Sequence, residues 1–227
     1  MRITSLFIVM LSLFVSACSY KVPTEVSPAT NIYSTYEDKI PGKFYLVSDS
    51  GMKNIHRDIK PSSYVCSAHS YPLTVDSSVS QSVRATLQNV FENIEEIDHM
   101  PTVEMMGKDG AQGVVFVKMK RFEPSIRFAM GFWSGTGIGT CDMVIEVVVK
   151  DKNNQTLVNT TVGGNRTTEG DSGAGCGGGA EVLSRAIYET TRDTMERLAE
   201  RVANSTKVRE AVSSDIAMQT NPSVAAD

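Results

Sequence analysis

Two stretches of the chain repeat apolar residues every three or four positions, and each predicts an amphipathic helix. The first begins at Ser78, with Gln81 three residues later as in a capping box. The second runs from Gly179 to about Ser205. The apolar positions are Val79, Val83, Leu87, Val90, Phe91 and Ile94 in the first helix and Leu183, Ala186, Ile187, Thr190, Leu198 and Val202 in the second.

Elsewhere apolar and polar residues alternate, which predicts half-buried β-strands. The alternation is clearest from Asp142 to Lys150, where four apolar side chains share one face. Turn residues at 151–154 precede a partner strand from Thr156 to Val162, so this region is predicted to form a β-hairpin. The other predicted strands are 43–48, 63–74 and 115–120.

The order of these elements predicts an α+β fold, an antiparallel or mixed sheet with two helices packed on one face. This arrangement buries both apolar helix stripes against the apolar face of the sheet. The predicted organisation is a signal peptide at 1–17, an acylated cysteine and flexible tether at 18–40, a single α+β domain at 41–205 and a disordered tail at 206–227.

The first residues of the chain have the pattern of a secretory signal. Arg2 supplies a basic start, Leu6 to Val15 form an apolar run, and the small residues Ser16 and Ala17 follow. The apolar run is too short to span a bilayer as a helix. We therefore expect the chain to be exported and cleaved.

The cleavage region resembles a lipobox, because Val15, Ser16, Ala17 and Cys18 fit an aliphatic residue, two small residues and a cysteine. The resemblance implies cleavage between Ala17 and Cys18, diacylglycerol on the Cys18 thiol and an acyl chain such as palmitate on its amino group. Ser19 stands where an Asp would imply retention at the inner membrane, so the resemblance implies the outer membrane. The alternative is an ordinary signal peptide that a cysteine happens to follow.

Three cysteines remain for the exported body: Cys66, Cys141 and Cys176. An oxidising compartment favours one disulfide and one free thiol, and three pairings are open. We predict Cys141 with Cys176, because a hairpin between them would bring the chain back toward its start.

Composition and motifs argue against several functions. The formal charge is −4 and there is no block of Lys or Arg, which disfavours nucleic-acid binding. His56, His69 and His99 lack metal-ligand spacing, and Ser134 is not in a nucleophile elbow. The glycine-rich stretch 173–179 lacks the Lys and Ser/Thr of a phosphate loop. We predict no catalytic residue, no metal and no cofactor other than the lipid on Cys18.

The stretch from Ile126 to Ile138 combines large apolar residues with glycines. One interpretation is a strand that turns inward and fills the core. The other is a loop that presents apolar side chains to a partner or to lipid, since aromatic residues and Met are frequent in binding hot spots. The residues of this predicted partner-binding loop are Phe128, Met130, Phe132 and Trp133.

The lipobox ending at Cys18, the helix after an early strand, the hairpin around 147–155 and the final helix after a glycine-rich loop resemble small outer-membrane lipoproteins. These include the YajG-like lipoproteins, the lipopolysaccharide-assembly lipoprotein, and relatives of the curli-export and penicillin-binding-protein-activator proteins. The resemblance implies a non-enzymatic accessory or assembly factor on the periplasmic face of the outer membrane, with a protein or envelope component as partner. The alternatives are a subunit of an outer-membrane pore or secretion complex, and an envelope hydrolase or thiol enzyme.

Overall fold

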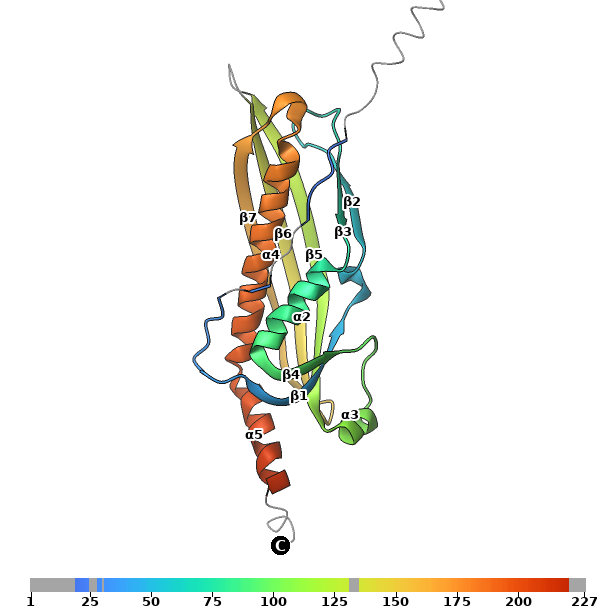
Figure 1. Ribbon diagram of the computed structural model, residues 1–227, viewed down its shortest axis with the longest axis vertical. Helices are drawn as coiled ribbons and strands as arrows, with labels where there is room; N and C mark the ends of the chain where they lie inside the picture. Colours follow the sequence, from blue (N-terminus) through green and yellow to red (C-terminus); the bar gives the residue numbers. More distant parts are fainter. Residues whose placement is uncertain (1–18, 25–27, 30, 131–134, 221–227) are drawn as a thin grey trace, which may run out of the picture.

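The chain folds into an elongated body whose longest strands run beside one long helix (Figure 1). The computed structural model describes residues 19–24, 28–29, 31–130 and 135–220, with side chains described up to residue 214. Its main sheet has the strand order β4-β1-β5-β6-β7. These strands are β1 (Ile40–Ser48), β4 (Phe91–Glu96), β5 (Ala111–Met130), β6 (Gly135–Asp151) and β7 (Thr156–Asp171).

The sheet is mixed. β1 pairs in parallel with both β4 and β5, whereas β5, β6 and β7 form an antiparallel meander. The predicted hairpin at 142–162 is confirmed as part of β6 and β7, joined by a turn in which the Asp151 carboxylate accepts the Asn153 and Gln155 amides. β1 reaches only residues 111–117 of β5, so the rest of the β5–β6–β7 meander extends past the five-stranded region.

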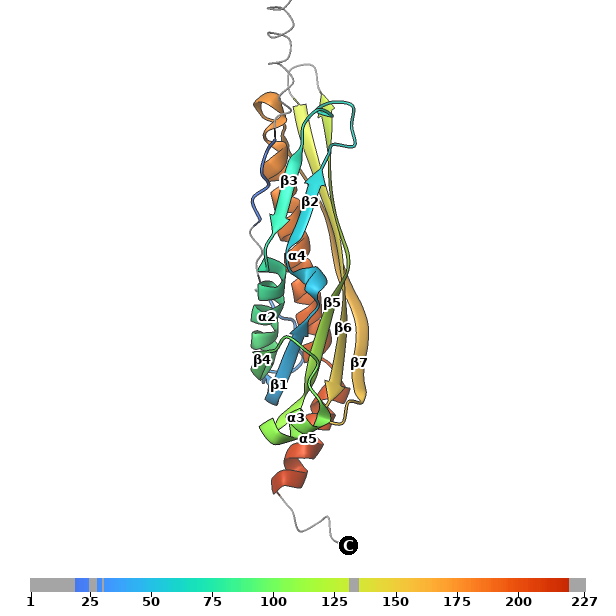
Figure 2. The same ribbon diagram turned by 90° about the vertical axis from the view of Figure 1, so that its right-hand side faces the viewer.

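Helices α2 (Ser78–Val90) and α4 (Gly179–Ala203) cover one face of the sheet (Figure 2). The predicted fold class is therefore confirmed. A shorter helix, α3 (Val103–Asp109), lies against the opposite face, where Met106 packs with Tyr45 and Val114. α5 (Thr206–Thr220) continues beyond α4 at the lower end in Figure 1.

A second, two-stranded sheet consists of β2 (Ile55–Ile59) and β3 (Tyr71–Val75). It lies beside the upper part of β5, where Ser62 just after β2 donates its amide to the Ile126 carbonyl at 2.9 Å. A short 3₁₀ helix, η1 (Ser50–Met52), joins β1 to β2, and a second, η2 (Ala174–Cys176), precedes α4.

The main core lies between the sheet and the two helices. Met143, Ile145 and Val147 of β6 each have 0% exposure, as the period-two pattern requires for one buried face. On β5 the core-facing residues are odd-numbered before a bulge between Met119 and Arg121 and even-numbered after it. The extra residue lets Val117 before the bulge and Phe122 after it both enter the core. The bulge therefore keeps one long strand amphipathic along its full length.

Glycines allow α4 to lie unusually close to the upper part of the sheet. A Cβ on Gly139 would lie 2.9 Å from the Leu183 Cα and 2.9 Å from the Val182 carbonyl oxygen. A Cβ on Gly164 would lie 2.9 Å from the Thr190 carbonyl oxygen. Because real Cβ atoms do not approach backbone this closely, the helix can dock here only over glycine.

The structure corrects several local predictions. Residues 63–70 form a loop rather than part of a strand, and Tyr64 is 96% exposed in it. The first helix ends at Val90, because Phe91 and Ile94 belong to β4 and pair with β1. Its N-cap is Ser77, so the predicted capping box at Ser78 is wrong. β2 and α3 were not predicted.

The segment that follows α4 also differs from its prediction. Residues 206–220 form α5 rather than a disordered tail. Val208 and Val212 on this helix are 0% and 2% exposed and join the main core. Val208 and Val212 are four residues apart, and two positions are too short a periodic pattern to predict a helix.

Candidate functional site

The N-terminal segment is attached to the upper end of the body. Cys18 and Ala17, the predicted lipid-attachment and cleavage residues, lie outside the described residues. The next residue, Ser19, forms a parallel bridge with Ser70, and Val22 forms another with Leu73. Tyr20 donates its amide to the Ser70 carbonyl at 2.9 Å. The predicted flexible tether at 18–40 is therefore wrong for its first described residues, which add to the free edge of β3.

Tyr20 ties this segment to the glycine-rich loop. Its hydroxyl donates to the Gly175 carbonyl at 2.8 Å, and its ring stacks on His69 and Tyr71. Tyr71 is fully buried and donates its own hydroxyl to the Cys176 carbonyl at 2.6 Å. Burial, and secondarily the nearby Tyr20 phenol, raises the pKa of Tyr71 to about 12. Two tyrosines thus hold the loop before α4 through their hydroxyl groups.

A disulfide joins Cys66 to Cys176, with 6.2 Å between the Cα atoms. The predicted pair of Cys141 with Cys176 is wrong. Cys141 lies in the middle of β6 with its side chain in the core, where register places it opposite Arg166. Cys176 follows β7 at the upper end, so the loop that carries Cys66 is its neighbour. The disulfide links the 60–70 loop to the start of α4.

Cys141 is a buried thiol rather than a reactive one. Burial raises its pKa to about 12, against which a hydrogen bond with Thr190 acts in the opposite direction. Because the thiolate is the nucleophile, a thiol held protonated in this way is inert at neutral pH.

The predicted partner-binding loop divides between core and surface. Phe128 is only 5% exposed and packs against Tyr71, with ring centroids 6.0 Å apart, and against Gly179 at the start of α4. The prediction that Phe128 faces a partner is therefore wrong. Met130, at the end of β5, is 64% exposed. Phe132 and Trp133 lie outside the described residues.

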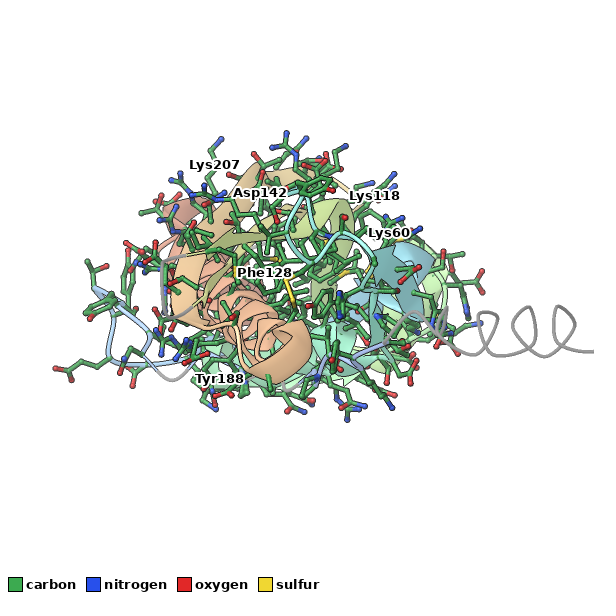
Figure 3. All side chains as sticks on the ribbon, turned by 90° about the horizontal axis from the view of Figure 1, so that it is seen from above. Lys60, Lys118, Phe128, Asp142, Tyr188 and Lys207 are labelled. Carbon is green, nitrogen blue, oxygen red and sulfur yellow. A yellow bond between two sulfur atoms is a disulfide. The ribbon has the colours of Figure 1, made fainter. Side chains whose placement is uncertain are left out.

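We call the region that contains Ser19, Tyr20, the 60–70 loop, Met130 and η2 the upper end. Its segments are far apart in the sequence and are joined by specific bonds. The Ser63 hydroxyl accepts the Phe128 amide at 2.8 Å, and the disulfide connects the same loop to η2. Figure 3 looks down on this end, with Phe128 inside the outline of the body. Tyr64 and Met130 are its exposed large apolar side chains among the described residues.

A second feature is a groove of about 610 Å³ near the lower end, between β7 and the junction of α4 with α5. Val158, Thr161 and Gly163 line it from β7, which is an outer strand of the main sheet. Arg197, Arg201 and Lys207 line it from the helices, together with one acidic residue, Glu200. The groove thus combines an outer strand with a surplus of positive charge.

The described residues also include polar groups that have structural partners. Arg166 on β7 pairs with Asp193 on α4 at 2.5 Å, and the pairing raises the Arg166 pKa. His56 contacts the Thr74 hydroxyl, and His69 contacts the Cys66 carbonyl. Among the residues that the structure describes, no three His, Cys, Asp or Glu side chains are grouped as metal ligands. In the same part of the chain no helix has the length and apolarity needed to cross a membrane.

Comparison with known proteins finds no family model that matches the chain and no curated protein similar in sequence. Among solved structures, a neuraminyllactose-binding hemagglutinin homolog from Helicobacter pylori has a TM-score of 0.43 at 7% identity, with 85% of this chain and 100% of that one covered. A DUF330 protein from Xanthomonas campestris has a TM-score of 0.41 at 8% identity, with 87% and 99% covered. A minor lipoprotein from Acinetobacter baumannii has a TM-score of 0.33 at 7% identity, with 78% and 96% covered. At these values the similarities assign neither a family nor a function.

Proposed function

We propose that this chain is a lipoprotein of a Gram-negative cell envelope, held on the periplasmic face of the outer membrane by acyl chains on Cys18. The observation that carries the proposal is the motif Val15–Ser16–Ala17–Cys18 directly after a short apolar run. Each buried methylene contributes about 0.8 kcal/mol, so two or more chains would hold the body firmly. The bridges of Ser19 with Ser70 and of Val22 with Leu73 of β3 support it, because the folded body begins directly after Cys18 and acyl chains there would hold it close to the membrane.

The proposed role is binding rather than catalysis, as expected of an accessory or assembly factor. The described cysteines support this role, since Cys66 and Cys176 form a disulfide and Cys141 stays protonated in the core. Neither state offers a thiolate nucleophile.

The groove beside β7 is the proposed site for a protein partner. An outer strand offers unpaired backbone groups to an extended segment, and Arg197, Arg201 and Lys207 favour a segment rich in Asp or Glu. The groove lies roughly 30 Å along α4 from Gly179, at the helical rise of 1.5 Å per residue. This distance would place it away from the membrane and open to the periplasm.

Radioactive palmitate labelling tests the anchor. We expect label on the parent protein and none on Cys18→Ser, with the parent in the outer-membrane fraction. An unlabelled parent that is released by osmotic shock would contradict the proposal.

Crosslinking in cells followed by affinity capture tests the groove. We expect Arg197→Glu/Arg201→Glu to lose captured protein that the parent retains. Arg84→Glu/Lys118→Glu is the matched control, because it reverses two exposed basic residues that do not line the groove. Equal recovery from all three proteins would argue against the groove and leave the anchor unaffected.

A further inference from the structure

The upper end has two exposed apolar side chains on segments that are distant in the sequence. Tyr64 is 96% exposed in the 60–70 loop, and Met130 is 64% exposed at the end of β5. Neither is a loose end of the chain. The loop is held by the disulfide at Cys66 and by the bond between Ser63 and Phe128. A fixed loop cannot fold back to bury its apolar side chain. Such a side chain leaves water only by contact with another molecule or with a membrane.

The position of Ser19 indicates that this contact is with the lipid bilayer, and this step rests on the proposed lipidation of Cys18. Consecutive Cα atoms are about 3.8 Å apart, so the acylated residue would lie within one residue of the bridge between Ser19 and Ser70. The body therefore has no long tether with which to stand away from the bilayer. Its upper end would lie against the lipid headgroups.

The other exposed large apolar residues that the structure describes do not share this position. Tyr33 lies near the lower end, where its carbonyl accepts a hydrogen bond from the Asn204 side chain just after α4. Val103 is the first residue of α3 and Met100 lies three residues before it, and α3 is at the opposite end of the body from Ser19 (Figure 1). The Tyr36 ring is already covered by Arg209, whose guanidinium carbon lies 3.9 Å from the ring centroid. Exposure alone therefore does not identify residues that contact lipid. Tyr64 and Met130 combine exposure with proximity to the anchor.

We infer that the upper end of this protein is a lipid-contacting surface in which Tyr64 and Met130 insert into the bilayer interface beside the acylated cysteine. Tyrosine suits this position, because its ring enters the apolar layer while its hydroxyl stays hydrated. Anchor and surface together hold the long axis upright, since one flexible lipid attachment alone would leave the body free to tilt. The orientation presents the β7 groove at the far end.

The test uses the processed chain from residue 18 with Cys18→Ser, so that no acyl chain dominates binding. Vesicles of phosphatidylethanolamine and phosphatidylglycerol are sedimented with this protein and with Tyr64→Ser/Met130→Ser. The matched control is Met100→Ser/Val103→Ser, which removes two exposed apolar residues at the other end. We expect the parent and control to sediment with vesicles and the upper-end variant to bind about tenfold more weakly, as losing a partly buried Tyr and Met implies.

Trp133 provides a second measurement, because it is the single tryptophan in the sequence and follows Met130 by three residues. We expect its fluorescence to shift to shorter wavelength with vesicles and to be quenched by brominated lipid. Circular dichroism of the variants checks that each is folded. A parent that ignores vesicles, or equal weakening in both variants, would overturn the inference.

The two proposals fail separately. Palmitate on Cys18 without vesicle binding by the unacylated chain would leave the lipoprotein proposal intact and remove the lipid-contacting surface. Vesicle binding without palmitate would remove the anchor and retain an apolar membrane-binding end.

Discussion

The two ends of this elongated body are stabilised in different ways. The lower end has five strands with α2 and α4 packed on them, and large apolar side chains meet there, such as Phe44 and Phe91 with ring centroids 4.6 Å apart. The upper end has the three-stranded extension of β5, β6 and β7 beside the small β2–β3 sheet. It is held by a disulfide, by tyrosine hydroxyl bonds and by close contact between α4 and glycine.

The difference follows from how much apolar surface each end can bury. A narrower layer offers less surface to remove from water, so covalent and close-packing restraints replace part of the hydrophobic contribution. The lower end gains its order from burial and should tolerate small changes at its periphery. The stability of the upper end should depend strongly on single substitutions at its disulfide, its tyrosine hydroxyl groups and its glycine contacts.

Removing the disulfide should have the largest effect. Cys66→Ser/Cys176→Ser opens a link across 110 residues, and a loop of that length contributes roughly 4 to 5 kcal/mol in the chain-entropy treatment. We expect a much lower urea midpoint than that of Cys141→Ala, which leaves the link in place. A difference below about 1 kcal/mol would mean that the upper end does not depend on its disulfide.

Alkaline pH should weaken the three-stranded extension of β5, β6 and β7, where Cys141 is buried opposite Pro124 of β5. Burial raises its pKa from 9.0 to about 12, so the unfolded chain loses the thiol proton first. The contribution of this thiol to the unfolding free energy should be fully present below pH 9 and be lost between pH 9 and 12, by about 4 kcal/mol at 1.4 kcal/mol per pKa unit.

Urea unfolding across this pH range measures the fall. Cys141→Ala should retain a smaller decrease, which begins near pH 10 because the Tyr71 pKa is raised from 10.0 to about 12. A parent and a Cys141→Ala variant with identical pH profiles would show that the thiol does not contribute.

Gly139→Val tests the close contact at the upper end. The new Cβ would lie 2.9 Å from the Leu183 Cα, so α4 must move away from β6 and expose part of the core. We expect a loss of about 3 kcal/mol in chemical unfolding, the upper range for overpacking. An unchanged midpoint would mean that α4 adjusts freely and that the glycines are not required.

Gly107→Ala should have the smallest effect and the opposite sign. Gly107 lies inside α3 at the lower end, and a Cβ there meets no atom within 4 Å. Alanine reduces the backbone freedom of the unfolded chain and should stabilise by about 0.5 to 1 kcal/mol, a small rise in the melting temperature. A loss as large as that of Gly139→Val would contradict the contrast between the ends.

Parts of the fold were predictable because their signals are local. The helix predicted at 179–205 is observed as Gly179–Ala203, and the hairpin at 142–162 has the predicted turn. The boundary between α2 and β4 was not predictable, because Phe91 and Ile94 continue the helical spacing of the residues before them. Their pairing with β1, 51 residues before Phe91 at Ile40, decides the outcome.

The candidate site divides in the same way. The lipobox prediction depends on contiguous residues and needs no fold. Phe128 and Met130 are two residues apart and share a hydrophobic character, yet one is 5% and the other 64% exposed, because β5 extends past the cover that Tyr71 and Gly179 give Phe128. The β7 groove combines residues from three elements and has no contiguous motif.

Periodicity along the chain was sufficient for the long helix and the hairpin, since each follows from backbone geometry and nearest neighbours. The choice of Cys66 as disulfide partner, the docking of Val22 on β3 and the burial of Val208 on α5 arose from contacts between distant segments. Such contacts depend on how the whole chain buries its apolar surface, and no single stretch of the sequence determines that burial.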